Sequence, residues 1–249
     1  MDKFMFDVVH FLAESGIDDS MKKIIDDIMS KGKSAVTAEQ ADLALRYLNT
    51  LAEKNDHDAL LSLGTLHYTG LGDIVQQDYT KAMSYYEKAA ESSELSNAWA
   101  LNNLGYCHYY GRAGEVDFEK AYSCFALSAM YSNPNAMYKL GDMYYYGNYV
   151  DKDFAASFYW YALAKQQYID TDKDYHGFLA ASIAFRVGRA YLFGEGTEID
   201  LVHALFELRT AEALFYKQVL IGDEFSRELL PKTQELIKAV QAELDKIIE

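Results

Sequence analysis

The chain has 249 residues, half of them hydrophobic, which is enough to build a sizeable core and excludes a wholly disordered chain. Its length suits one domain or one continuous array of repeats. Asp and Glu outnumber Lys and Arg by 38 to 23, and the resulting net charge of −15 argues against nucleic-acid or anionic-membrane binding.

The amino terminus has no basic stretch followed by an apolar run, so we expect no secretory signal. No window approaches the roughly 18 uninterrupted apolar residues of a membrane-spanning helix. Two cysteines, Cys107 and Cys124, do not make a disulfide framework. We therefore expect a cytoplasmic protein in which both thiols are free.

The first elements are helices. Residues 2–14 form an apolar segment that predicts a helix, and a second helix is expected over about 19–31, with Gly32 as its stop. Residues 37–54 carry small residues in register with later parts of the chain. They predict the second helix of a degenerate leading repeat.

The central part of the chain is a fourfold repeat. A glycine follows Leu or Val at intervals of 41, 36 and 47 residues, and a second glycine comes six residues after each. An aspartate follows, with small residues four and eleven positions beyond it. The leading glycines are Gly64, Gly105, Gly141 and Gly188; the second glycines are Gly70, Gly111, Gly147 and Gly194; the aspartates are Asp78, Asp117, Asp153 and Asp200.

This repeat predicts a helix hairpin. The first glycine lies inside helix A and allows another helix to approach closely, while the second glycine ends helix A where a positive φ is needed. The aspartate caps helix B, because its carboxylate accepts from free backbone N–H groups and matches the positive end of the helix dipole. Neither helix buries its apolar face alone, so the hairpins must stack.

The pattern resembles the Sel-1-like repeat family, relatives of tetratricopeptide repeats. The third copy carries it most fully, with Asn133-Pro134-Asn135-Ala136, Leu140-Gly141, Tyr144, Gly147, Val150, Asp153, Trp160-Tyr161 and Ala164. Departures are His67 and His108 where the family has Tyr, and Glu207-Leu208 in place of an aromatic pair. Over about residues 40–215 the resemblance implies an all-α, right-handed α/α superhelical solenoid that acts as an adaptor.

The ends complete the array. Extra residues at 95–97 and 170–176 are expected between one helix B and the next helix A. Pro231 is expected to open a last helix, 232–248, that covers the final hairpin. The predicted organisation is therefore amino-terminal capping helices over 1–36, the repeat array over 37–222, and a carboxy-terminal capping helix over 223–249.

Sequence motifs of catalysis are missing. No phosphate loop, zinc-protease motif, Cys-x-x-Cys pair or nucleophile elbow occurs. The sharpest alternative is a metal site formed by His67, His108, Cys107 and Cys124, and the competing interpretation is that each histidine replaces a buried tyrosine. We expect no catalytic residue, metal or cofactor.

A helical wheel centred on the repeat glycine predicts the binding groove. Positions −3, −2, +1, +4 and +5 share the face of helix A that lines the concave side of such superhelices. Tyrosine is enriched there, as at protein interfaces, although these rings could instead pack between stacked helices. The predicted groove residues are Tyr68, Asn102, Asn103, Tyr106, Tyr109, Tyr110, Tyr138, Asp142, Tyr145, Tyr146, Arg186 and Arg189.

Two functions follow as hypotheses. The first is a non-enzymatic scaffold that holds a peptide or protein domain in this groove, with aromatic contacts over Tyr106, Tyr109 and Tyr145 and an acidic end near Arg186 and Arg189. The second is a bacterial immunity protein that neutralises a toxin, for which a small acidic repeat protein is suited. An enzyme or metal protein is the third, less favoured, alternative.

Overall fold

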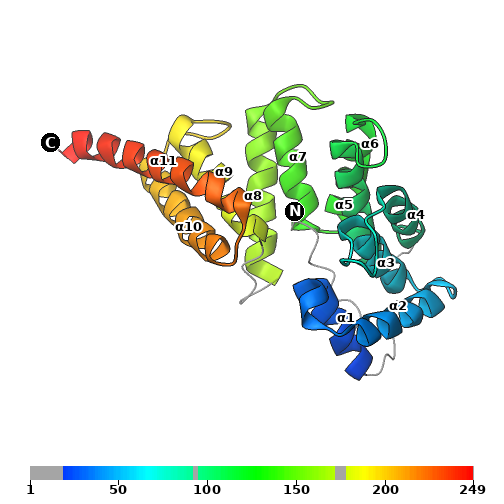
Figure 1. Ribbon diagram of the computed structural model, residues 1–249. Coiled ribbons are helices and arrows are strands. Elements are labelled where there is room, and N and C mark those ends of the chain that lie inside the picture. The colour runs from blue at the N-terminus through cyan, green and yellow to red at the C-terminus, as the bar shows by residue number, and fades with distance from the viewer. Residues whose placement is uncertain (1–18, 92–94, 172–177, 249) are drawn as a thin grey trace. The chain divides into compact units, whose positions relative to one another are not determined.

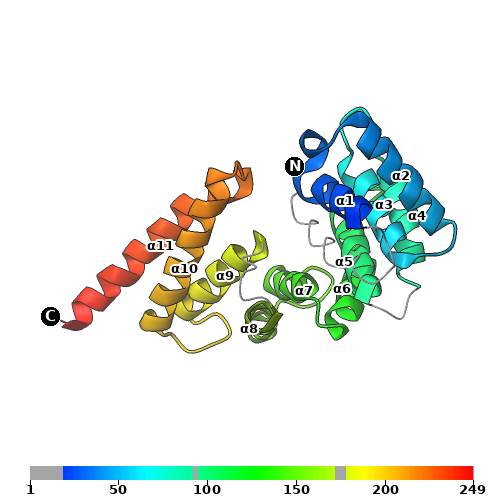
Figure 2. The same cartoon turned by 90° about the horizontal axis from the view of Figure 1, so that it is seen from below.

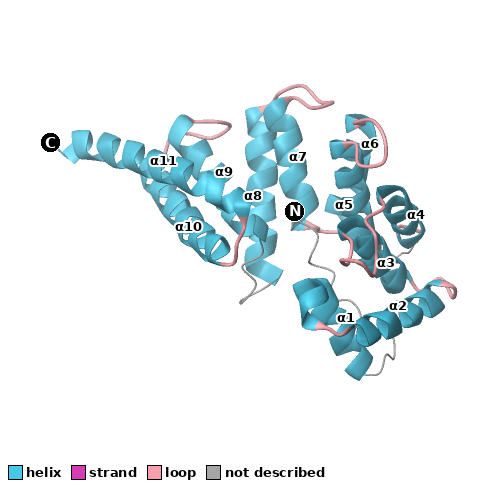
Figure 3. Cartoon of the chain, in the orientation of Figure 1, coloured by secondary structure: helices cyan, strands magenta, loops and turns pink. Residues whose placement is uncertain are grey.

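The computed structural model describes residues 19–91, 95–171 and 178–248, and every regular element in these ranges is a helix (Figure 3). The prediction of an all-α helical repeat solenoid is confirmed, whereas the hand of its superhelix stays a prediction. No helix in the described ranges is long and apolar enough to cross a membrane. The helix expected over 2–14 lies outside the described residues.

The chain divides into two compact units, Met1–Asn133 and Pro134–Glu249. The first holds α1 (Asp19–Lys31), the 3-10 helix η2 (Gly32–Ala35), α2 (Ala38–Ala52), α3 (His57–Thr69), α4 (Tyr79–Ala89), α5 (Leu95–Tyr110) and α6 (Phe118–Met130). The second holds α7 (Pro134–Tyr146), α8 (Phe154–Thr171), α9 (Phe178–Phe193), α10 (Leu201–Leu220) and α11 (Glu224–Ile248) (Figure 1). The domain boundaries predicted at residues 36 and 222 stay predictions.

Four antiparallel hairpins form the repeats, α3/α4 and α5/α6 in the first unit and α7/α8 and α9/α10 in the second. In the third repeat α7 ends at Gly147, whose φ of +74° is easily reached only by glycine. Asp153 then caps α8, since its Oδ1 accepts from the backbone N of Ala155 at 2.8 Å and of Ala156 at 3.0 Å. Its own N–H donates to the carbonyl of Tyr144 at 3.0 Å, which closes the turn.

The other three hairpins repeat this turn, which confirms the predicted stops and caps. Gly70, Gly111 and Gly194 have positive φ, and Asp78, Asp117 and Asp200 cap α4, α6 and α10. The backbone N–H of each of these aspartates also donates to a carbonyl near the end of helix A, at 2.8 to 3.0 Å. The carbonyl belongs to the residue three positions after the leading glycine of the repeat.

The repeat glycines lie where the two helices of a hairpin touch. A Cβ on Gly141 would fall 2.6 Å from the Tyr161 ring of α8, closer than real Cβ contacts occur. The equivalent pairs are Gly64 with Tyr86, Gly105 with Phe125 and Gly188 with Leu208. The predicted close approach is confirmed, and the neighbour in each case is helix B of the same repeat.

The leading repeat is also helical. The helix predicted over about 19–31 is α1, and Gly32 with φ of +72° follows it. Within the segment predicted over 37–54, Thr37 caps α2 in a reciprocal capping box with Gln40.

The carboxy-terminal helix begins earlier than the sequence predicted. α11 starts at Glu224, and Pro231 lies inside it instead of opening it. Gly222, with φ of +86°, ends α10, and Asp223 Oδ2 accepts from the backbone N of Ser226 at 2.7 Å. The same glycine-then-aspartate signal that marks the hairpins therefore starts α11, and proline is tolerated at an exposed position.

One predicted insertion is part of a helix. Leu95–Asn97 form the first turn of α5, since the segment up to Leu101 has neither glycine nor proline to stop a helix. The extra residues thus lengthen helix A and do not form a loop. Most of the second insertion, 172–176, lies outside the described residues.

Candidate functional site

In the first three repeats the residue after the repeat glycine lies against the aromatic ring of helix B that packs on that glycine. In the third repeat Tyr161 Oη donates to Asp142 Oδ1 at 2.7 Å. In the first repeat Tyr86 Oη donates to Thr65 Oγ1 at 3.4 Å. A side chain at this position therefore links helix B to the groove-lining face of helix A. Whether it is Thr, Tyr or Asp determines the polarity and charge of that face.

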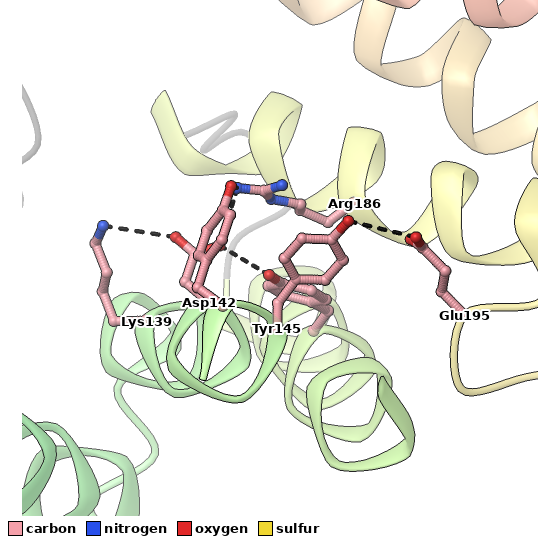
Figure 4. A network of polar contacts seen from close by, with 7 residues as sticks. Lys139, Asp142, Tyr145, Arg186 and Glu195 are labelled. Atoms are coloured by element: carbon pink, nitrogen blue, oxygen red, sulfur yellow. Dashed lines mark hydrogen bonds and ion pairs between the residues drawn. The ribbon is translucent and has the colours of Figure 1, made fainter. Parts of the chain in front are cut away.

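Asp142 is the centre of a polar network in the second unit (Figure 4). Its carboxylate is almost fully buried and lies 3.1 Å from Arg186 Nη2 on α9 and 3.6 Å from Lys139 Nζ on its own helix. Arg186 also donates to Tyr146 Oη at 2.9 Å. Because one carboxylate meets two cations and a hydroxyl, the third and fourth repeats are joined through charge as well as apolar packing.

The network alters the protonation of its members. Burial opposes the charge on Arg186, but the Asp142 carboxylate and nearby tyrosines outweigh it, so the pKa of the guanidinium lies above its ordinary value. Burial, with Asp142 beside it, raises the pKa of Tyr138 to about 12. The pKa of Tyr161 is raised for the same two reasons. Both phenols therefore stay neutral, and Tyr161 keeps the proton that it donates to Asp142.

A second cluster lies on the same side of α9. Arg189 Nη2 is 2.9 Å from Glu195 Oε1, and Tyr145 Oη donates to that same oxygen at 3.3 Å. The Arg189 guanidinium stands over two rings, 4.9 Å from the centre of Tyr145 and 5.8 Å from that of Phe193. Burial raises the pKa of Tyr145, so its hydroxyl keeps the proton that it donates.

A small pocket opens between these clusters. Its walls include Ser157, Phe158, Arg186, Arg189 and Glu195. It has room for about one water molecule, too little for a cofactor. The Ser157 hydroxyl is buried there and has no hydrogen-bond partner among the described residues.

The first unit has a counterpart centred on Arg112. Its Nε donates to Tyr68 Oη at 3.1 Å. The guanidinium also lies within 5.9 Å of the ring centres of Tyr68, Tyr79 and Tyr110. Arg112 and Glu195 both follow a turn glycine directly, and each binds the tyrosine hydroxyl at position +4 of the preceding repeat.

The two asparagines of α5 are core residues. Asn102 and Asn103 are almost fully buried, and Asn102 Nδ2 donates to Asn103 Oδ1 at 3.3 Å. Beside them the Tyr106 ring packs edge-on against Phe125 at 5.5 Å. Tyr109 packs against Phe118 at 5.2 Å. These side chains of α5 pack inside the first unit, in part against α6, and expose little area to a partner.

The hairpins match a known family. The family model described as Sel1 repeat matches residues 57–93, 100–130, 134–168 and 182–206, more than half of the chain. The chain belongs to the Sel1 repeat family. Each matched segment overlaps one hairpin, and the fourth ends inside α10. The family consists in general of protein-interaction scaffolds, typically without catalytic activity.

The chain is similar to parts of two curated proteins of a yeast. A putative ERAD-associated E3 ubiquitin-protein ligase component of Schizosaccharomyces pombe is 34% identical over 85 residues, 34% of this chain and 11% of that protein. An uncharacterized Sel1-like repeat-containing protein of the same yeast is 32% identical over 85 residues, 34% of this chain and 12% of that one. The chain thus spans about a tenth of the curated relatives it matches.

Solved structures share the fold. A protective antigen of uropathogenic Escherichia coli with an SLR fold superposes with a TM-score of 0.61 at 23% identity, covering 89% of this chain and 44% of that one. A Sel1 repeat protein from Oxalobacter formigenes gives a TM-score of 0.58 at 22% identity, covering 82% of this chain and 78% of that one. At these identities the likeness concerns the fold alone.

The predicted groove residues of the Sel1 array fall into three groups by exposure. Buried are Tyr68, Asn102, Asn103, Tyr106, Tyr138 and Asp142. Partly exposed are Tyr109, Tyr145, Arg186 and Arg189, and well exposed are Tyr110 and Tyr146. The buried members can act only by holding the exposed ones in place. Their role in binding is untested and stays a prediction.

Two residues of these clusters were missed by the sequence argument. Arg112 and Glu195 lie at position +7, just beyond the end of helix A, and a wheel of that helix does not cover them. The available signal was their shared place directly after a positive-φ glycine, from which a side chain can turn back onto the preceding repeat.

The histidines and cysteines of the hypothetical metal site do not form a ligand cluster. Among the described residues no group of three or more His, Cys, Asp or Glu side chains could hold a metal ion. His67 stacks on Tyr85 at 5.6 Å, and burial lowers its pKa. Cys107 and Cys124 are free thiols whose pKa values burial raises to about 12 and about 11.

Proposed function

We propose that this protein is a non-enzymatic scaffold that binds a peptide or protein domain in the predicted concave groove, through the face of its A helices that carries repeat positions +4 and +5. One observation supports the proposal most. Three successive A helices end in an exposed aromatic residue: Tyr110, Tyr146 and Phe193 are 45%, 53% and 51% exposed. Large apolar side chains at the same repeat position, Tyr110 in the first unit and Tyr146 with Phe193 in the second, favour a role in recognition over chance exposure.

Each of these rings has a guanidinium beside it. The distances from ring centre to Cζ are 5.3 Å for Arg112 at Tyr110, 5.4 Å for Arg186 at Tyr146 and 5.8 Å for Arg189 at Phe193. The guanidinium faces hold the rings in place, and the arginines can also pair with carboxylates. The ligand we propose is therefore a segment with apolar or aromatic side chains next to an acidic residue.

The surface is largely preorganised. Arg186 is held by Asp142 and Tyr146, and Arg189 by Glu195. Rigid side chains lose less conformational entropy when a ligand binds, which favours affinity from a small area. We further propose a cytoplasmic location, because free buried thiols are typical of reducing compartments.

The test begins with affinity capture of the partner and its identification by mass spectrometry. Calorimetry then compares Tyr146→Ala and Phe193→Ala with a control, Tyr159→Ala. Tyr159 is 59% exposed but lies on helix B of the third repeat, away from the proposed surface. We expect each of the first two variants to lose about 2 kcal/mol of binding and the control to lose almost nothing.

A different pattern would reject the proposal. If Tyr146→Ala and Phe193→Ala bind like the parent while Tyr159→Ala is weakened, the partner uses the B helices. Should the captured partner be a toxin that the protein inactivates, the scaffold would be an immunity protein, and the same variants would then test its surface.

A further inference from the structure

Helix α10 carries two opposed apolar faces. The buried face contains Ala204, Leu208, Ala211 and Phe215, which pack in the second unit. α10 packs against both α9 and α11, and Figure 2 shows it between them. On the other side of α10 an exposed row, here called the outer seam, consists of Val202, Phe206, Arg209, Ala213, Tyr216 and Leu220. Its spacing of 4, 3, 4, 3 and 4 residues is that of a coiled-coil seam.

The other repeats provide an internal comparison. The positions that correspond to Val202 and Phe206, two and six residues after the capping aspartate, are Thr80 and Ser84 in α4 and Glu119 and Ser123 in α6. These four are exposed and polar, as expected for a helix that faces solvent. In α8 the corresponding residues are Ala155 and Tyr159, which are also exposed. In α10 Val202 is 68% exposed, Phe206 64% and Leu220 86%. Among the described residues α10 exposes four large apolar or aromatic side chains, Val202, Phe206, Tyr216 and Leu220, whereas α8 exposes one, Tyr159. This concentration on one helix indicates that α10 has a partner.

We infer that the outer seam binds a second copy of this chain, with the two α10 helices antiparallel about a twofold axis near residue 211. An antiparallel register pairs Val202 with Leu220 of the partner subunit and Phe206 with Tyr216 of the partner subunit. Arg209 then faces Ala213 of the partner subunit, whose small side chain leaves room for the longer one. Every seam residue has a complementary neighbour, which a closed twofold interface requires.

The charges of α10 agree with self-association. Arg209 lies 2.9 Å from Glu212 within the chain, and in this register it also comes beside Glu212 of the partner subunit. Two cations and two carboxylates thus meet at the axis. The acidic residues of α10 are Glu207, which is buried, and Glu212, which is partly exposed. Most of the carboxylates behind the net charge of −15 therefore lie outside the outer seam. Repulsion between those carboxylates on the two chains is screened by salt beyond about 8 Å.

The interface is small, because the seam covers about 27 Å of a single helix. We therefore expect a dissociation constant in the range of about 1 to 100 µM. Sedimentation velocity of the full chain over that range should show a monomer–dimer equilibrium. Phe206→Glu and Leu220→Glu should each raise the dissociation constant at least about tenfold. Tyr159→Glu, which places the same charge at the equivalent position of α8, should leave it unchanged.

Disulfide trapping tests the register. A mixture of Arg209→Cys and Ala213→Cys chains should form a cross-linked heterodimer, while each variant alone should cross-link poorly. A parent that stays monomeric over the whole range would overturn the inference, and so would a dimer that Phe206→Glu and Leu220→Glu do not weaken. Cross-linking of Arg209→Cys with itself would indicate parallel helices and overturn the antiparallel register. The inference does not rest on the proposed ligand surface of the A helices.

Discussion

Replacing Asp142 by Asn tests the buried ion pair that joins the third and fourth Sel1 repeats. The amide oxygen of Asn can still accept from Tyr161, but the negative charge that faces Arg186 and Lys139 is gone. The Arg186 side chain is only 15% exposed, so its charge is left poorly solvated. The variant should therefore be destabilised by far more than the loss of one surface ion pair.

The magnitude follows from the degree of burial. Removing one member of a buried pair costs about 3–5 kcal/mol. Arg186 keeps its hydrogen bond to Tyr146 and some contact with solvent, so we expect a loss of about 2–4 kcal/mol in the free energy of unfolding. For a chain of this length the melting temperature should fall by about 5–15 °C. Asp151→Asn, at an exposed position nearby, should change stability by less than about 0.5 kcal/mol.

The assay must report on the second unit. Trp99 and Trp160 are the two tryptophans, and only Trp160 lies in that unit. Urea unfolding is therefore followed by fluorescence in a Trp99→Phe background. Adding Arg186→Met removes the stranded charge, so the double variant should be more stable than the two single effects predict, by about 1.5–3 kcal/mol. Additivity within about 0.5 kcal/mol would refute the coupling that the distances indicate.

Three further predictions concern packing, thiols and proline. Gly141→Leu should destabilise the protein by about 1–3 kcal/mol because the Tyr161 ring occupies the space that its side chain needs; Gly114→Leu, where a Cβ meets nothing within 4 Å, should be nearly neutral in thermal melts. Because burial raises the pKa of Cys107 from 9.0 to about 12, its thiolate fraction near pH 8 is lowered on the order of a thousandfold. The Cys107 thiol should react very slowly with a disulfide reagent in the native state. After denaturation both cysteines should react, and a count other than two thiols would contradict their assignment as free. Pro231→Ala should stabilise α11 by about 1–2 kcal/mol. A proline inside a helix costs about 3 kcal/mol, and the lower conformational entropy that it gives the unfolded chain offsets only part of this cost. A lower melting temperature of the variant would contradict the prediction.

The helix boundaries that could be predicted are those with a local cause. Gly147 and Asp153 mark the end of one helix and the start of the next because a positive φ and a capping carboxylate depend on the residue itself and its immediate neighbours. A positive-φ glycine and a capping aspartate also stand at Gly222 and Asp223, where α11 starts. The start predicted from Pro231 is therefore wrong, because this proline lies inside the helix.

The candidate site depended on more than local signals. The wheel of helix A placed Tyr146 and Arg186 on one face, and the structure brings them to 2.9 Å. It could not separate buried from exposed members of that face, because burial depends on how the next repeat packs. Tyr138 and Tyr146 are both tyrosines on α7, yet one is 5% and the other 53% exposed.

The sequence by itself determined that this protein is a set of Sel1 hairpins. Their glycines, aspartates and small residues recur at fixed spacings. The turn glycines and capping aspartates act on backbone geometry within a few residues, and the repeat glycines allow contact between the two helices of one hairpin. Only the tertiary structure decided which side chains meet across repeats, such as Asp142 with Arg186 and Glu195 with Tyr145. Such contacts join residues some 40 to 50 positions apart. Their formation depends on how whole helices stack, which no local spacing specifies.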